Sequence, residues 1–293
     1  MKLEQVDSQT PTRDFIIEKP IYGLRVACEL SVTSGFSPSP HNYFNLIAIS
    51  EIIGGSISIK YKTKGGQTTR PMNSIDIQTL LEFSQFGEGM IDLSLGANGN
   101  YFMTGIIPFS DSGALAFNND ESLIITVTKL SGGFDTINLE TIENPIFGFD
   151  YYDFTTLDVV SGAREKVFPV SEYDTIMIPL KDLDSSTELT FHHTNGVSID
   201  YNSDTLYLMG QTVNDVCYNI DGQIISGYGR FAILNLDTVK NLEINRTSSD
   251  AFSMTAIRTD IVGNLKEVQE VNNKLQHTSL AKFDTALINQ KIK

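Results

Sequence analysis

Apolar and polar residues alternate with a period of two over much of this chain, most regularly between Tyr101 and Leu130. Within Glu121–Lys129, the apolar residues of one face are Leu123, Ile125 and Val127. Such alternation is typical of a strand with one buried face. The segment between Tyr101–Phe109 and Glu121–Lys129 is rich in Asp, Asn, Ser and Gly, which favour turns. The stretch therefore predicts two strands joined by a long polar turn.

The same pattern predicts more strands in the first half. The candidates are Ile21–Val32, Phe44–Ile53, Gly54–Thr63 and Met90–Leu95. The sequence KGGQ at Lys64–Gln67 favours a hairpin-type turn. Met72–Phe86 is the one short helix predicted in this half, with Asn73 or Ser74 as its cap and Gly87 at its end.

The second half repeats the strand pattern. Its strand candidates are Leu157–Val160, Glu165–Val170, Thr175–Leu180, Glu188–His192, Val197–Tyr201, Thr205–Met209, Val213–Ile220, Gln223–Ile225, Arg230–Asn235, Asn241–Asn245 and Phe252–Arg258. Asn195-Gly196 and Asp221-Gly222 lie between candidates and are strong hairpin signals. Turns at such short intervals are typical of a sandwich or jelly roll.

One segment without clear alternation precedes the first half, and another joins the two halves. Residues 1–20 are polar and bracketed by Pro11 and Pro20, so we expect an arm that a neighbouring subunit would order. Residues 134–156 join the halves and are unusually aromatic, with Phe147, Phe149, Tyr151, Tyr152 and Phe154. We expect this linker to pack between the two sandwiches, and an aromatic sugar-binding platform is the sharper alternative.

The pattern changes to helical spacing at the C-terminal end. Asp260–His277 is predicted to be an amphipathic helix, capped by Asp260, with an apolar stripe of Ile261, Leu265, Val268, Val271 and Leu275. A second apolar set follows, made of Leu280, Phe283, Leu287 and Ile288. Such a stripe must be buried on its own domain, on a neighbour or at a membrane, and we expect the tail to act in assembly.

These elements predict an all-β protein with two tandem β-sandwiches, each a simple sandwich or a jelly roll, followed by a C-terminal amphipathic helix. We expect an N-terminal arm over residues 1–20 and a first sandwich or jelly roll over 21–145. The second is expected over 146–259 and the helical tail over 260–293. The length of 293 residues agrees with about two domains.

Composition narrows the function. The formal net charge is −15 and the pI is about 4.6, so we expect no direct contact with nucleic acid, which needs a basic face. The first fifteen residues lack the apolar core of a signal peptide, and we expect synthesis in the cytoplasm.

Two patterns raise the question of metal binding. Asp200–Asp204 matches the first five positions of a calcium loop, but Thr205 and Gln211 stand where a glycine and a glutamate belong, so an Asx-rich turn is the default. His192 and His193 are neighbours on a predicted strand, so they point to opposite faces and cannot share a metal.

The other candidate residues, two cysteines and several carboxylates, do not point to a particular chemistry either. Cys28 and Cys217 are too few for a disulfide framework and we expect both to be buried. Carboxylate pairs such as Asp182 and Asp184 would suit a glycosidase, but nothing in the sequence selects a pair. We assign no catalytic, cofactor-binding or metal residue and no cofactor, and we expect a protein that is not an enzyme.

Two successive β-rich halves, a short helix in the first half, a polar front segment and a helical tail together resemble a double jelly-roll major capsid protein. The resemblance is to those of membrane-containing icosahedral bacteriophages of the corticovirus and finnlakevirus type. It covers about residues 21–258 and is carried by Ser56–Lys62, Asp76–Phe83 and Ala116–Lys129.

The resemblance implies a structural protein that forms pseudo-hexameric, trimeric capsomers of an icosahedral shell. It implies a homotrimer that contacts neighbouring capsomers, with termini that contact neighbours, minor capsid proteins or an internal membrane. The protein would then be made in the host cytoplasm and located in the virion. The alternative is a β-sandwich binding module, such as a phage receptor-binding or fibre protein or a lectin-like adhesin.

Overall fold

The structure of the chain is a computed structural model, and it describes these residues: 2–30, 54–62, 68–86, 91–95, 100–115, 117, 121–130, 134–143, 148, 150–212, 216–220, 223–227, 230–248 and 250–261. The predicted strand Phe44–Ile53 lies outside the described residues. The same holds for the C-terminal helix beyond Ile261.

The first half contains nine strands and one helix among the described residues. The strands are β1 (Lys2–Asp7), β2 (Thr12–Ile17), β3 (Gly23–Leu30), β4 (Gly55–Lys62), β5 (Thr68–Asp76), β6 (Ile91–Leu95), β7 (Tyr101–Pro108), β8 (Ser122–Lys129) and β9 (Thr136–Ile142). The helix α2 (Ile77–Phe86) lies between β5 and β6.

The second half has a corresponding set of elements. Its strands are β10 (Asp150–Val159), β11 (Glu165–Pro169), β12 (Thr175–Pro179), β13 (Glu188–His193), β14 (Ser198–Asn202), β15 (Val216–Ile220), β16 (Gln223–Gly227), β17 (Phe231–Asn235), β18 (Val239–Asn245) and β19 (Phe252–Ile261). The short helix η2 (Leu180–Asp182) follows β12, and the helix α3 (Ser203–Thr212) follows β14.

Strand pairing shows that each half is a jelly roll. In the first half, β1 pairs with β9, β2 with β8, β3 with β7 and β4 with β5, all antiparallel. In the second half, β10 pairs with β19, β11 with β18, β12 with β17 and β13 with β14, again antiparallel. When β6, β15 and β16 are set aside, each roll has eight strands, which pair first with eighth, second with seventh, third with sixth and fourth with fifth, as in a long hairpin rolled into two sheets.

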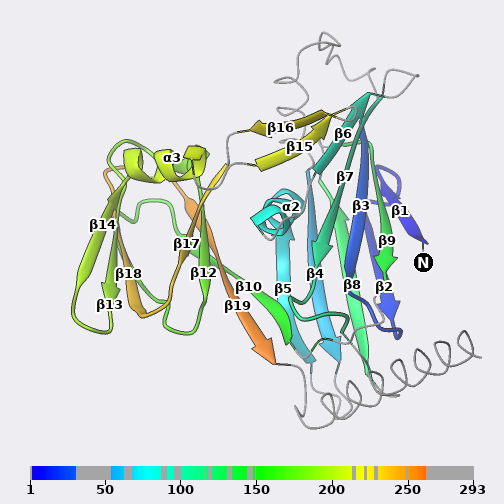
Figure 1. Cartoon of the computed structure of the whole chain (residues 1–293), viewed down its shortest axis with the longest axis horizontal. Coiled ribbons are helices and arrows are strands. Elements are labelled where there is room, and N and C mark those ends of the chain that lie inside the picture. Colours follow the sequence, from blue (N-terminus) through cyan, green and yellow to red (C-terminus); the bar gives the residue numbers. More distant parts are fainter. Residues whose placement is uncertain are drawn as a thin grey trace, which may run out of the picture.

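The two rolls are joined into one body by shared sheets (Figure 1). β5 of the first roll and β10 of the second pair in parallel, so that one eight-stranded sheet has the order β17-β12-β19-β10-β5-β4-β8-β2. β15 of the second half pairs in parallel with β6, so that the hairpin β15–β16 extends the first roll's other sheet. The remaining sheet, β11-β18-β13-β14, completes the second roll.

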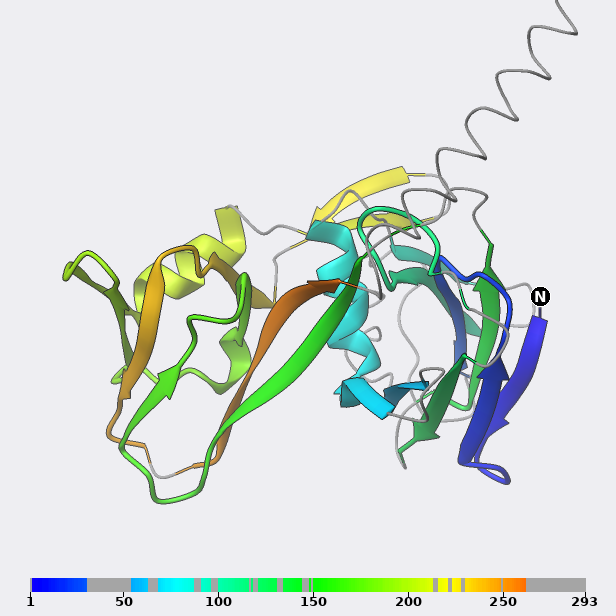
Figure 2. The same cartoon turned by 90° about the horizontal axis from the view of Figure 1, so that it is seen from below.

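Each roll has its own apolar core, and α2 lies between them (Figure 2). The second roll's part of the shared sheet is buried on both faces: Ile176 and Ile178 contribute to the second core, whereas Met177 and Ile257 pack into the first. Fully burying such a side chain stabilises the fold by roughly 1.5–3 kcal/mol. Because Met177 and Ile257 pack into the first core, that core extends across the junction into the second roll.

Residues 1–20 require a correction, because they do not form an arm. β1 and β2 are the first and second strands of the first roll, paired with β9 and β8. In β2 the buried or half-buried residues are Arg13, Phe15 and Ile17, alternating with exposed Thr12, Asp14 and Ile16. Because β2 is an edge strand with many polar residues, its apolar and polar positions alternate too weakly to predict a strand.

Residues 134–156 are likewise more than a linker. β9 is the eighth strand of the first roll and β10 the first strand of the second, so only a few residues join the rolls. In β9 the buried positions are Ile137, Leu139 and Thr141, and the buried threonine weakened the apolar pattern.

Two helix predictions are corrected as well. Residues 72–76 continue β5, and α2 begins at Ile77 with the backbone N–H of Thr79 donating to Asp76 at 3.2 Å, so the cap is neither Asn73 nor Ser74. At the C-terminal end, the helix was predicted to begin at Asp260, but Asp260 and Ile261 still belong to the strand β19.

Candidate functional site

The aromatic residues predicted to pack between the sandwiches form a cluster at the junction of the rolls. Phe83 of α2 meets Tyr152 and Phe154 of β10 edge to face, with ring centroids 5.0 and 5.2 Å apart. Phe154 is buried, and Tyr151 and Tyr152 pack half-buried against the first core. These three rings therefore serve packing, while Phe147 and Phe149 lie outside the described residues.

A buried ion pair crosses the same junction. The guanidinium of Arg230, just before β17, lies 3.4 Å from the carboxylate of Glu82 on α2, and the Glu82 side chain is only 2% exposed. Gln78, one helical turn earlier, donates its Nε2 to Glu82 at 2.8 Å. The pair joins the first roll's helix to the second roll.

The start of β10 is fixed to the first roll by hydrogen bonds. Ser110 donates its hydroxyl to buried Asp150, and Ser112 donates its hydroxyl at 2.6 Å and its backbone N–H at 3.2 Å to the same oxygen. The backbone N–H of Gly148 donates to the carbonyl of Ala114 at 2.7 Å. The short connection between the rolls is therefore attached to the first roll.

Arg258 of β19 gathers three carboxylates beside this junction. Its guanidinium lies 2.6 Å from Asp153 and 3.1 Å from both Glu172 and Asp260. Burial raises the pKa of the Asp153 carboxyl even though Arg258 acts to lower it. The cluster joins β10, β19 and the segment before β12, and each of its three carboxylates has an ion-pair partner within the fold.

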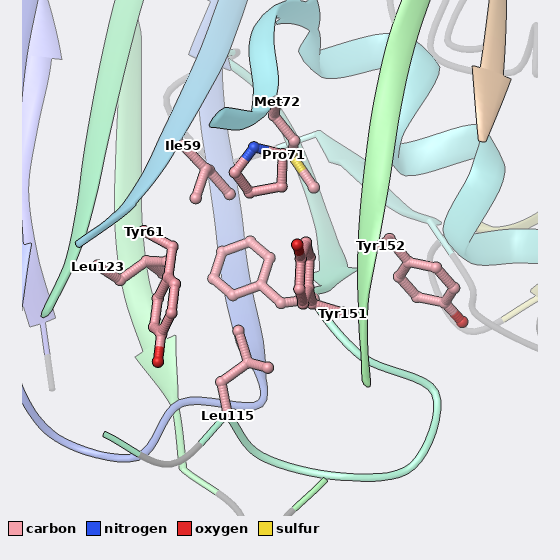
Figure 3. Close-up of a pocket in the computed structure, with 9 residues that line it drawn as sticks. Ile59, Tyr61, Pro71, Met72, Leu115, Leu123, Tyr151 and Tyr152 are labelled. Carbon is pink, nitrogen blue, oxygen red and sulfur yellow. The ribbon is translucent and has the colours of Figure 1, made fainter. Parts of the chain in front are cut away.

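A small cavity lies at one end of the first sandwich (Figure 3). Its volume is about 20 Å³, enough for about one water molecule. It is lined by Ile59, Tyr61, Pro71, Met72, Phe109, Leu115, Leu123, Tyr151 and Tyr152. With this size and lining, the cavity is a gap in the packing and offers no catalytic constellation.

The candidate calcium loop forms the start of α3. Asp200 of β14 accepts a hydrogen bond from the Thr190 hydroxyl at 2.8 Å. Asn202 caps α3, because it accepts the backbone N–H and the hydroxyl of Thr205, both at 2.8 Å. These side-chain oxygens are engaged within the fold, as expected for an Asx-rich turn. The predicted strand Thr205–Met209 is wrong, since these residues are helical.

The two histidines of β13 have separate partners. His192 lies 2.9 Å from the Ser198 hydroxyl and 3.0 Å from the Glu243 carboxylate, so it bridges two neighbouring strands. His193 lies 3.0 Å from the hydroxyl of Thr238. Within the described residues, no three His, Cys, Asp or Glu side chains are grouped so as to hold a metal ion.

The remaining candidate residues from the sequence are the two cysteines and the carboxylate pair Asp182 and Asp184. Cys28 is buried in the first core, and burial raises the pKa of its thiol to about 12. The side chain of Cys217 lies outside what the structure describes. Asp184 accepts hydrogen bonds from the hydroxyl and the backbone N–H of Ser186, and these bonds lower the pKa of the Asp184 carboxyl. Asp182 belongs to the short helix η2.

Across the described part of the chain, no helix is long and apolar enough to cross a bilayer.

Comparison with known proteins shows no matching family model and no matching curated protein. Among solved structures, the chain is similar to the major capsid protein P2 from bacteriophage PM2, with 8% identity and a TM-score of 0.49 over 90% of this chain and 98% of that chain. It is also similar to a turret protein in Sulfolobus turreted icosahedral virus, with 8% identity and a TM-score of 0.21 over 89% of this chain and 98% of that chain.

A third likeness is to a variant of oxalate decarboxylase from Bacillus subtilis, with 7% identity and a TM-score of 0.24 over 90% of this chain and 76% of that chain. At these TM-scores and identities, none of the three likenesses assigns the chain to a family or a function. The class that the fold itself defines is an all-β protein with two jelly rolls in one chain.

Proposed function

We propose that the protein is a shell-building subunit, the major capsid protein of an icosahedral virus. The observation that carries the proposal is the duplicated strand order, in which both halves are complete jelly rolls with the same pairing. Jelly rolls also occur in lectins and cupins, so a single roll would leave the function open. The duplication, with both rolls joined by a shared sheet, favours a subunit that tiles a surface.

Two similar rolls held side by side give one chain two similar outer faces. Three such chains around a threefold axis would present six similar rolls, and this pseudo-hexamer would pack in a hexagonal lattice. The tiling needs a constant angle between the rolls. The shared eight-stranded sheet, the two-sided burial and the Glu82–Arg230 pair support that requirement. The proposal includes the division of the rolls between residues 145 and 146.

The proposed partners are two further copies in a homotrimer and the neighbouring capsomers in a virion. A net charge of −15 per chain opposes close association, so the trimer should depend on salt. The first test is therefore the mass of the purified chain by analytical ultracentrifugation at several salt concentrations. We expect a trimer that is favoured by moderate salt. A monomer at micromolar concentration in every salt condition would instead favour the binding-module alternative.

A further inference from the structure

Six neighbouring strands of the eight-stranded sheet, from β19 to β2, each have one end at the same side of the first roll. Register places Ile261, where β19 ends, opposite Asp150, and Ile17, where β2 ends, opposite Leu123. The strand order β19-β10-β5-β4-β8-β2 contains five steps between them. At about 4.8 Å per step the two strand ends are roughly 24 Å apart, on the side where both arrowheads point in Figure 1.

A groove opens beside the end of β2. Its volume is about 170 Å³, and its lining includes Ile16, Ile17, Glu18, Lys19, Thr141 and Glu143. Ile16 is 65% exposed, which is more than any other large apolar side chain among the described residues. Glu18 and Glu143 are exposed carboxylates beside it. The groove therefore combines an uncovered apolar surface with a rim on which two carboxylates outnumber the single ammonium group of Lys19.

The surface between the end of β19 and this groove is also partly apolar. Tyr151 of β10 and Tyr61 of β4 are half-buried at this end of the sheet, and the Tyr61 ring lies 5.9 Å from Phe117. Figure 3 shows the two tyrosines over the small cavity. A chain that left β19 and followed the strand ends would meet these rings before reaching Ile16.

We propose that the chain's own C-terminal segment, residues 262–293, crosses this end of the sheet and docks in the groove beside Ile16. The reach agrees with the sequence, because residues 262–277 as a helix span about 24 Å. The second apolar set, which contains Phe283, then arrives at the groove, and Lys282 beside it complements Glu18 and Glu143. Attachment at Ile261 gives the segment a high effective concentration at the groove, which favours its own chain over a second copy.

The chain has no tryptophan, so Phe283→Trp in the full chain is a specific reporter. We expect a blue-shifted emission maximum and protection from acrylamide quenching, both independent of protein concentration. Adding Ile16→Asp should shift the emission to that of a solvent-exposed indole, and Glu143→Lys should weaken the protection. Ile106→Asp is the matched control, because Ile106 is an exposed apolar residue of β7 outside the groove, and should change nothing.

Three results would overturn the assignment. Solvent-like emission in the Phe283→Trp chain would show that the segment is not docked. A blue shift that survives Ile16→Asp and Glu143→Lys would place it elsewhere. A blue shift that grows with protein concentration would assign the groove to the tail of a second copy. The proposal does not rest on the capsid function, since all readouts are made on the soluble chain, whether or not it forms a trimer.

Discussion

The carboxylate of Glu82 lies 3.4 Å from the guanidinium of Arg230, although 147 residues separate them along the chain and they belong to different jelly rolls. Glu82 is 2% exposed and Arg230 17% exposed. A buried pair of this kind adds little net stability compared with apolar residues, but removing one partner is costly. The pair therefore opposes any other alignment of the rolls.

We predict that Glu82→Gln destabilises the protein by about 3 kcal/mol in urea unfolding, because it leaves the Arg230 charge in poorly hydrated surroundings beside a neutral group. The double variant Glu82→Gln with Arg230→Met should recover much of this loss. The control is Glu140→Gln, which breaks an exposed pair with Arg25 and should cost about 1 kcal/mol or less. Equal effects at the two sites would contradict the account.

Phe83→Ala should also weaken the junction of the rolls. The change removes two edge-to-face contacts, with Tyr152 and Phe154, and leaves a gap between α2 and β10. A loss of about 3 kcal/mol is expected. Phe102→Ala, on the outer face of β7, is the matched control and should cost much less. If both variants unfold at the same urea concentration, α2 does not hold the rolls together.

The sequence pattern predicted the strands that have one clean apolar face. Leu123, Ile125 and Val127 of β8 are all buried, as their alternation requires. The pattern was misleading at Thr205–Met209, where Leu206 and Leu208 alternate, because Leu206 is buried and Leu208 is 58% exposed on a helix. The Asn202 side chain, a good helix cap, was the available signal.

Edge strands and long-range pairs were beyond this kind of prediction. β2 and β9 contain too many polar residues for their alternation to be distinctive, so an arm and a linker were predicted in their place. The parallel contacts of β5 with β10 and β6 with β15 leave no local trace, because they depend on how the two rolls pack. At the junction, the aromatic composition singled out Tyr152 and Phe154, whereas no sequence spacing pointed to the Glu82–Arg230 pair.

A chain truncated after Ile261 should remain folded. Within the described part of the chain, both apolar clusters consist of residues between Val6 and Ile257, so each roll already has a core of its own before residue 262. We expect a cooperative thermal transition by circular dichroism with a strand-dominated spectrum. A control truncated after Ser253 removes most of the eighth strand of the second roll and should not fold. If the truncation after Ile261 also fails to fold, the tail belongs to the core.

Asp184 gives a prediction about pH. The hydrogen bonds from Ser186 lower the pKa of the folded carboxyl below its unfolded value of about 3.9. The folded state therefore prefers the ionised form, and this stabilisation is complete above the unfolded pKa and is lost as the pH falls through the folded pKa. Asp184→Asn should lower the melting temperature at pH 7, and this difference from the parent chain should shrink as the pH falls below the unfolded pKa. A difference that grows on acidification would contradict the assignment.

The capsid proposal is tested most directly by electron microscopy of the full-length chain, purified after expression and concentrated in moderate salt. The account predicts trimeric particles with six similar lobes around a threefold axis, and their packing into hexagonal sheets or closed shells. Single particles with only two lobes, and no lattice at any salt or protein concentration, would contradict it.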